Sequence, residues 1–288
     1  MGELDGMPPQ AQAQDIALNL KQPPKPPKPP LAARPSRQRA LREMRRAEQQ
    51  AARGEIAEAI KSLEQAVAFG ADRYTCFLRM ARLHQTRRQW SEAVVAAEKA
   101  IAEEPAKLTA REAVITLHLE ARNYEKAIDA SKALLKISPR HVPARDALGA
   151  AYMGLGDLDA ALRVANDLIR LDPSNPSHRF TKAHLCEHQG EMSLAIEEFE
   201  RVSDLVPHGD IGDAARRHLE NLDSFQLNQI MALAYEDMIF RLNLMQDSDA
   251  AIHDKGFCLS ELGREALHDL ASDGFPDLDA PTTLSQYH

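Results

Sequence analysis

Small and apolar residues recur along the chain in the pattern of two helices that cross closely, and residues 142–173 show this pattern most clearly. Apolar residues return there every three or four positions, as they do on one face of an α-helix. Gly156 divides the stretch into two such segments, and Pro173 follows the second. Because proline lacks an amide donor and clashes with the preceding turn, it stops a helix. The pattern therefore predicts two antiparallel helices joined by a turn at Gly156.

The same pattern recurs at a fixed step of 34 residues. Counted from Val142 as place 1, place 20 is always alanine: Ala59, Ala93, Ala127, Ala161 and Ala195. Place 17 is always apolar: Ile56, Trp90, Tyr124, Leu158 and Met192. Place 32 is proline in all copies but the first: Ala71, Pro105, Pro139, Pro173 and Pro207. Five copies in one register, starting at residues 40, 74, 108, 142 and 176, predict a repeat protein.

Residues at seven fixed places of the repeat that begins at Val142 carry a resemblance to a known family. They are Leu148, Gly149, Tyr152, Gly156, Ala161, Leu168 and Pro173. This set resembles the tetratricopeptide repeat, whose period is 34 residues. The resemblance implies an all-α fold, a right-handed α-solenoid of five helix-turn-helix repeats with a capping helix and a C-terminal helical tail. It also implies that the first helices of the repeats line a concave surface.

The chain divides into five segments on this basis. Residues 1–36 contain the run KQPPKPPKPP and predict a disordered, extended arm. Residues 37–209 hold the five repeats, and residues 210–223 predict a polar capping helix. Residues 224–273 predict a helical tail, and residues 274–288 a disordered C-terminus.

Residues 225–245 are unusually apolar, with fourteen apolar residues in twenty-one. Their spacing predicts a helix that is apolar on more than one side, so more than one side must be covered. Either the following helices of the tail cover it, or a second molecule does so by self-association. Glu236, Asp237 and Arg241 lie near the middle and argue against insertion into a membrane.

Composition and charge narrow the class of protein. The chain is 44% apolar, 27% charged and only 5% aromatic, which suits a large helical domain. The N-terminus has no positive region followed by an apolar one, and no run is apolar enough to cross a bilayer. Three cysteines without a CxxC pair indicate free thiols in a reducing compartment. These features predict a cytoplasmic protein; an exported protein with buried thiols would need a leader.

Charge is unevenly distributed along the chain. Residues 21–53 carry a net charge of +8, whereas the chain from Gly54 onward carries −13. Clustered Lys and Arg bind polyanions by releasing counterions, so the arm is a candidate contact for nucleic acid, an anionic membrane surface or an acidic protein. The simpler interpretation is a solvated end. No helix-turn-helix or aromatic RNA-binding platform supports nucleic acid as the partner.

In the resembled family, places 2, 5, 9 and 12 of each repeat face the groove, where isolated apolar residues among charges form pockets for a peptide. The candidate protein-binding residues are Met44, Leu78, Arg82, Gln85, Glu112, Leu119, Met153, Phe180, His184 and Glu187. The family's known carboxylate clamp for chaperone tails is missing, because Met44, Glu48, Thr109 and Ala113 stand where Lys, Asn or Arg is needed. The acids at 112, 146 and 187 suggest a partner with some basic character.

Several histidines raise the question of a metal or catalytic site. His84 and His118 occupy place 11, where a ring packs between helices, so we assign them to the core. His184 and His188 share a helix face, and His218 lies one repeat further on. No HExxH or paired CxxC accompanies them, so we predict no metal and no cofactor.

The sequence also predicts no enzyme. Unbroken repeats leave no long loop for catalytic residues, and no phosphate-binding loop or GxSxG elbow is present. We therefore predict a non-enzymatic interaction scaffold that binds a peptide or protein segment in its groove. The alternative is a regulator whose basic arm contacts nucleic acid or another polyanion while its repeats bind a protein.

Overall fold

The computed structural model describes residues 36–272, which form fourteen helices and no strand. Two predicted segments lie outside the described residues. They are the arm at residues 1–36, apart from Ser36, and the disordered segment at residues 274–288.

Ten of the helices form five consecutive pairs, one pair for each predicted repeat. They are α1 (Arg37–Ala52) with α2 (Ile56–Ala68), α3 (Arg73–Thr86) with α4 (Trp90–Glu103), α5 (Thr109–Glu120) with α6 (Tyr124–Ile137), α7 (Val142–Leu155) with α8 (Leu158–Leu171), and α9 (Pro176–Gln189) with α10 (Met192–Leu205). The remaining helices are α11 (Asp210–Glu236), α12 (Met238–Gln246), α13 (Ser248–Asp254) and α14 (Glu261–Ser272). The predicted all-helical repeat architecture is confirmed.

The alanines at place 20 explain why the two helices of each repeat can pack closely. All five alanines of place 20 are at most 1% exposed, so a larger side chain there would push the two helices of a pair apart. Place 8 on the first helices is likewise buried in four of the five repeats, at Ala47, Ala81, Ile115 and Ala183. The buried apolar residues form clusters that follow one another along the stack, and each cluster joins neighbouring pairs, as expected of a solenoid.

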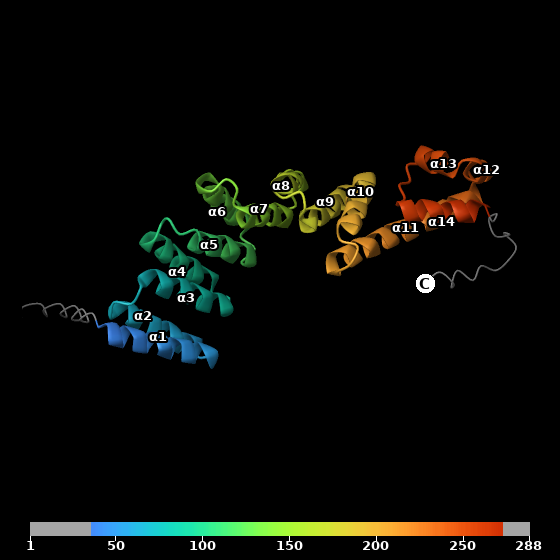
Figure 1. Ribbon diagram of the computed structural model, residues 1–288. Coiled ribbons are helices and arrows are strands. Elements are labelled where there is room, and N and C mark those ends of the chain that lie inside the picture. The colour runs from blue at the N-terminus through green and yellow to red at the C-terminus, as the bar shows by residue number, and fades with distance from the viewer. Residues whose placement is uncertain (1–35, 273–288) are drawn as a thin grey trace, which may run out of the picture.

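The stack is curved (Figure 1). The first helices α5, α7 and α9 lie toward the inside of the curve, and their partners α6, α8 and α10 lie toward the outside. The candidate protein-binding residues on α5, α7 and α9 therefore belong to helices of the inner side.

The turn between the helices of each repeat needs a left-handed backbone at place 15. Gly54, Gly156 and Gly190 adopt it with φ of 78°, 78° and 80°. Arg88 and Arg122 stand at the same place in repeats two and three and adopt φ of 56°. Because a side chain makes this conformation costly, these two turns are strained relative to the glycine turns.

The end of the stack differs from the sequence pattern. Helix α11 runs without a break across residues 223 and 224, where we placed a boundary between capping helix and tail. No glycine or proline stands there to interrupt a helix. The chain breaks instead at Asp237, inside the stripe predicted as one helix, because the Asp237 carboxylate accepts hydrogen bonds from the N–H groups of Ile239 and Phe240 and starts α12.

The second half of α11 packs with α12, α13 and α14 into a small unit with its own core. That core includes Ile230, Phe240, Leu244, Ile252 and Leu267. The unit thus covers one side of the apolar segment. Other apolar side chains remain exposed, namely Phe225, Met238, Ile239, Leu242 and Met245. None of the helices between residues 36 and 272 has the length and apolar character to cross a membrane.

Candidate functional site

The candidate protein-binding residues all lie on the first helices α1, α3, α5, α7 and α9. Met44, Leu78, Leu119 and Phe180 are half-buried and pack against the core. Met153 alone of the apolar candidates is exposed, at 39%. On this face most of the apolar candidate side chains therefore lie half-buried between polar side chains and do not project into solvent.

Polar side chains connect the first helices of the N-terminal repeats. Glu48 on α1 forms an ion pair with Arg79 on α3. Gln85 on α3 donates hydrogen bonds from Nε2 to both carboxylate oxygens of Glu120 on α5, each at 2.8 Å. Arg82 is exposed, and it has no ion pair with any residue in 36–272.

Histidines pair with carboxylates in the next two repeats. Glu112 on α5 lies 2.8 Å from Nε2 of His141, the N-cap of α7. Asp146 on α7 lies 3.6 Å from Nδ1 of the buried His178 on α9. Burial raises the pKa of Asp146, although the charge of His178 opposes this shift. Two of the acids that suggested a basic partner thus already have partners within the chain.

These contacts form a ladder, meaning the series of polar pairs that joins each first helix to the next. The paired residues stand 29 to 35 residues apart, close to the 34-residue step. Sequence reasoning missed these pairs, although polar partners about one repeat apart were a usable signal.

A cavity of about 180 Å³ lies between the first two repeats. Its apolar lining comes from Ala47, Leu63 and Leu83 on α1, α2 and α3. Its charged lining comes from Glu48, Arg79 and Arg82. Since Glu48 is paired with Arg79, the charge left available for a ligand at this cavity is that of Arg82.

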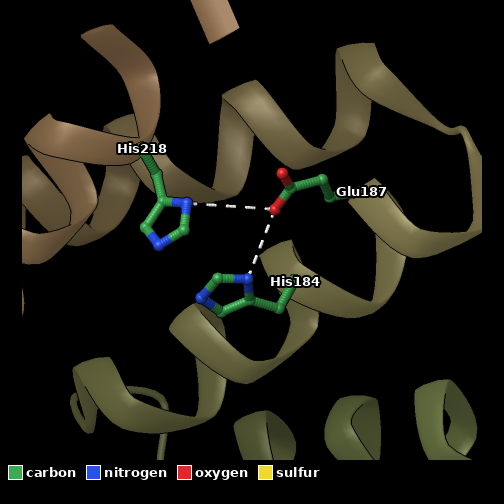
Figure 2. Close-up of side chains that lie close together, drawn as sticks. All are labelled: His184, Glu187 and His218. Atoms are coloured by element: carbon green, nitrogen blue, oxygen red, sulfur yellow. Dashed lines mark ion pairs between the residues drawn. The ribbon is translucent and has the colours of Figure 1, made fainter. Parts of the chain in front are cut away.

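A second cluster lies at the other end of the inner face, between α9 and α11 (Figure 2). Oε2 of Glu187 lies 3.3 Å from Nδ1 of His184 and 4.0 Å from Nδ1 of His218. The two imidazole rings are 4.4 Å apart between centroids and nearly perpendicular. Phe199 stacks on His218 at 5.1 Å, and the edge contact between Phe180 and His184 measures 4.7 Å.

Burial lowers the pKa of His184, and the nearby His218 lowers it further, while Glu187 opposes both effects. His184 and His218 both stand at place 9, so the repeat step predicted that they are neighbours. The third member is not the one expected from spacing. His188 is exposed and outside the cluster, because Glu187, three residues after His184, is the side chain that faces α11.

His84 and His118 are both half-buried between helices. Nδ1 of His84 lies 3.1 Å from Oε1 of Gln89. Burial lowers the pKa of His118. Neither residue belongs to the cluster of metal-ligand type in the described part of the chain.

Comparison with known proteins agrees with the repeat pattern. The family model described as tetratricopeptide repeat matches residues 34–203. The solved structure of MamA from Desulfovibrio magneticus RS-1, which runs from residue 41 to the end, is similar with a TM-score of 0.50 at 19% identity, covering 58% of this chain and 94% of that structure. Another crystal structure of MamA gives a TM-score of 0.50 at 15% identity, with 58% and 92% covered. No curated protein sequence matches significantly. Because the family model covers more than half of its length, this chain belongs to the tetratricopeptide repeat family.

Proposed function

We propose that this protein is a non-enzymatic scaffold that binds an extended peptide segment on the inner face of its repeats. The cavity between the first two repeats carries this proposal, because it combines an apolar lining with one charged group available for a ligand. Such a site accepts one long apolar side chain and orients it through a neighbouring charge.

The charges favour a particular kind of segment. Glu112, Asp146 and Glu187 are each close to a histidine, so they are less available to a basic ligand. Arg82 presents a guanidinium at the cavity, and a guanidinium binds a carboxylate with two parallel hydrogen bonds. The segment we propose has a bulky apolar residue next to Asp or Glu.

Selection from a random peptide library on the full-length protein tests this proposal. We expect selected peptides to share an apolar residue beside an acid, and to lose about tenfold in affinity or more on Arg82→Glu, since a charged hydrogen bond is removed and a like charge added. Arg163→Glu is the control, because Arg163 is exposed on α8 of the outer side. Equal affinity of both variants would reject the cavity as the binding site.

A second candidate function rests on α1. Arg37, Arg39, Arg42 and Arg45 are exposed on this terminal helix, ahead of an acidic body. A polyanion such as nucleic acid binds clustered arginines with a strong dependence on salt. Retention of the full-length protein on an RNA or DNA column at moderate salt, lost in an Arg42→Glu, Arg45→Glu double variant, would favour this role.

The exposed apolar side chains of the tail are where we propose that two copies of the chain associate. They are Phe225, Met238, Ile239, Leu242 and Met245, and exposed apolar clusters of this kind often mark protein contacts.

We also propose a cytoplasmic location, which the free thiols of Cys76, Cys186 and Cys258 support. Cell fractionation tests that location.

A further inference from the structure

The histidine spacing alone predicted no metal, but from the positions of the side chains we propose that His184, Glu187 and His218 bind a divalent transition metal, with zinc as the best fit, on the inner face between α9 and α11. One ligand atom from each residue lies within 4.8 Å of the other two. Imidazole nitrogens and a carboxylate oxygen are ligands that zinc commonly takes in proteins.

The distances are close to those of a loaded site. Ligands at about 2.1 Å from a tetrahedral zinc ion stand roughly 3.4 Å apart. Glu187 Oε2 is already 3.3 Å from Nδ1 of His184 and 4.0 Å from Nδ1 of His218. The ligand atoms of His184 and His218 lie within 4.8 Å of each other, so zinc requires His218 to move closer to both other ligands.

The orientation of the side chains supports the same site. Both Nδ1 atoms point toward one carboxylate oxygen, although they come from different helices (Figure 2). Phe180 and Phe199 pack around the two imidazole rings and restrict their rotation. Ligands that are held in place before binding lose less conformational freedom when the metal enters.

Access and charge also fit a bound cation. The side chains of His184, Glu187 and His218 are 27%, 28% and 36% exposed, so an ion reaches them from solvent. The chain from Gly54 onward carries −13, which favours a cation over an anion. Three protein ligands leave a fourth position for water or for a side chain of a bound partner.

The alternative is that the rings only pack against Phe180 and Phe199, with Glu187 as a polar neighbour. Isothermal titration of zinc chloride into chelator-treated full-length protein separates the two interpretations. We expect one zinc per chain at the tightest site, and binding at least about tenfold weaker for His218→Ala and for Glu187→Gln. His188→Ala is the matched control and is expected to bind zinc as the natural chain does, since His188 lies outside the cluster.

Cobalt absorption provides a second measurement that does not depend on stability. Tetrahedral coordination by the cluster predicts intense visible bands for the natural chain and for His188→Ala, and their loss in His218→Ala. Far-UV circular dichroism in chelator shows that each variant is folded. Unchanged zinc affinity in folded His218→Ala overturns the proposal, and so does loss of binding in His188→Ala, because the latter assigns zinc to the His184 and His188 pair instead.

Discussion

Asp223 on α11 accepts two hydrogen bonds from Ser260, one from its backbone N–H at 2.8 Å and one from its hydroxyl. Both residues are buried, although they are 37 positions apart. Gln226, one turn further along α11, accepts a hydrogen bond from the N–H of Cys258 at 2.8 Å and donates one to its carbonyl oxygen. These four residues attach the loop before α14 to the middle of α11.

Replacing Asp223 should release this end of the tail. Asp223→Ala removes two hydrogen bonds to a charged group and leaves the Ser260 hydroxyl buried without its acceptor, at an expected cost of about 3 kcal/mol. We expect faster hydrogen exchange in α14, measured by mass spectrometry, with little change in α1 to α8. Glu220→Ala, at an exposed position of α11, is the control. Equal exchange in the two variants would show that the Ser260 contact does not hold the tail.

Helix α11 is continuous where the repeat pattern predicted a boundary between two segments. The pattern predicted five pairs and their alanine seams, because close helix crossing restricts place 20 to a small residue. Beyond residue 209 no second helix followed in register, so we placed a boundary at residue 223. Asp223 contributes to tertiary structure there through Ser260, a distant contact that local spacing does not reveal.

The sequence likewise predicted only part of the cluster of His184, Glu187 and His218. His184 and His218 are separated by the 34-residue step, so both stand at place 9 and the repeat pattern puts them on one face. That Glu187 completes the cluster depends on which face of α9 meets α11. The ladder of polar pairs likewise depends on side-chain rotamers and on the angle between successive repeats, neither of which periodicity determines.

Strain at the two arginine turns should be relieved by glycine. Arg88→Gly and Arg122→Gly place the residue without a Cβ where φ is 56°, as in the three repeats that already have glycine at place 15. Each is expected to raise the free energy of unfolding by about 1 kcal/mol, measured by urea denaturation. Arg87→Gly, at the preceding helix C-cap with φ of −90°, is the control and should destabilise. A loss of stability in Arg88→Gly would contradict the strain argument.

Glu198 should make the C-terminal repeat sensitive to acid. Its side chain is 2% exposed and lies 2.9 Å from Lys182 Nζ, 3.0 Å from Arg179 Nη1 and 3.1 Å from Arg201 Nη1. Burial raises the pKa of Glu198, but Lys182 and Arg179 outweigh it and hold the pKa below its ordinary value of 4.5. The ionised Glu198 therefore stabilises the folded protein above pH 4.5. This stabilisation is lost as the pH falls through the pKa that Glu198 has in the folded protein.

Glu198→Gln tests this sign directly. We expect the variant to be about 2–3 kcal/mol less stable at neutral pH, because Lys182, Arg179 and Arg201 each lose a charged partner, and to lose less stability than the natural chain below pH 4.5. Chemical denaturation at a series of pH values measures both effects. Glu197→Gln, whose side chain is 49% exposed, should leave the pH profile unchanged. Parallel profiles for natural chain and Glu198→Gln would exclude Glu198 as the titrating group.

The exposed tail surface makes a prediction about oligomeric state. Ile239 is 72% exposed on α12, with Met238, Leu242 and Met245 exposed beside it, so a second copy that packs there buries apolar area on both sides. We expect analytical ultracentrifugation to find a dimer of the natural chain, and Ile239→Glu to shift it toward monomer, because a carboxylate in the contact is desolvated without a partner. Leu194→Glu, which adds the same charge at an exposed apolar position of α10, should leave the dimer intact. A natural chain that stays monomeric at the highest concentration tested, or a dimer that survives Ile239→Glu, would remove the tail surface as the site of self-association.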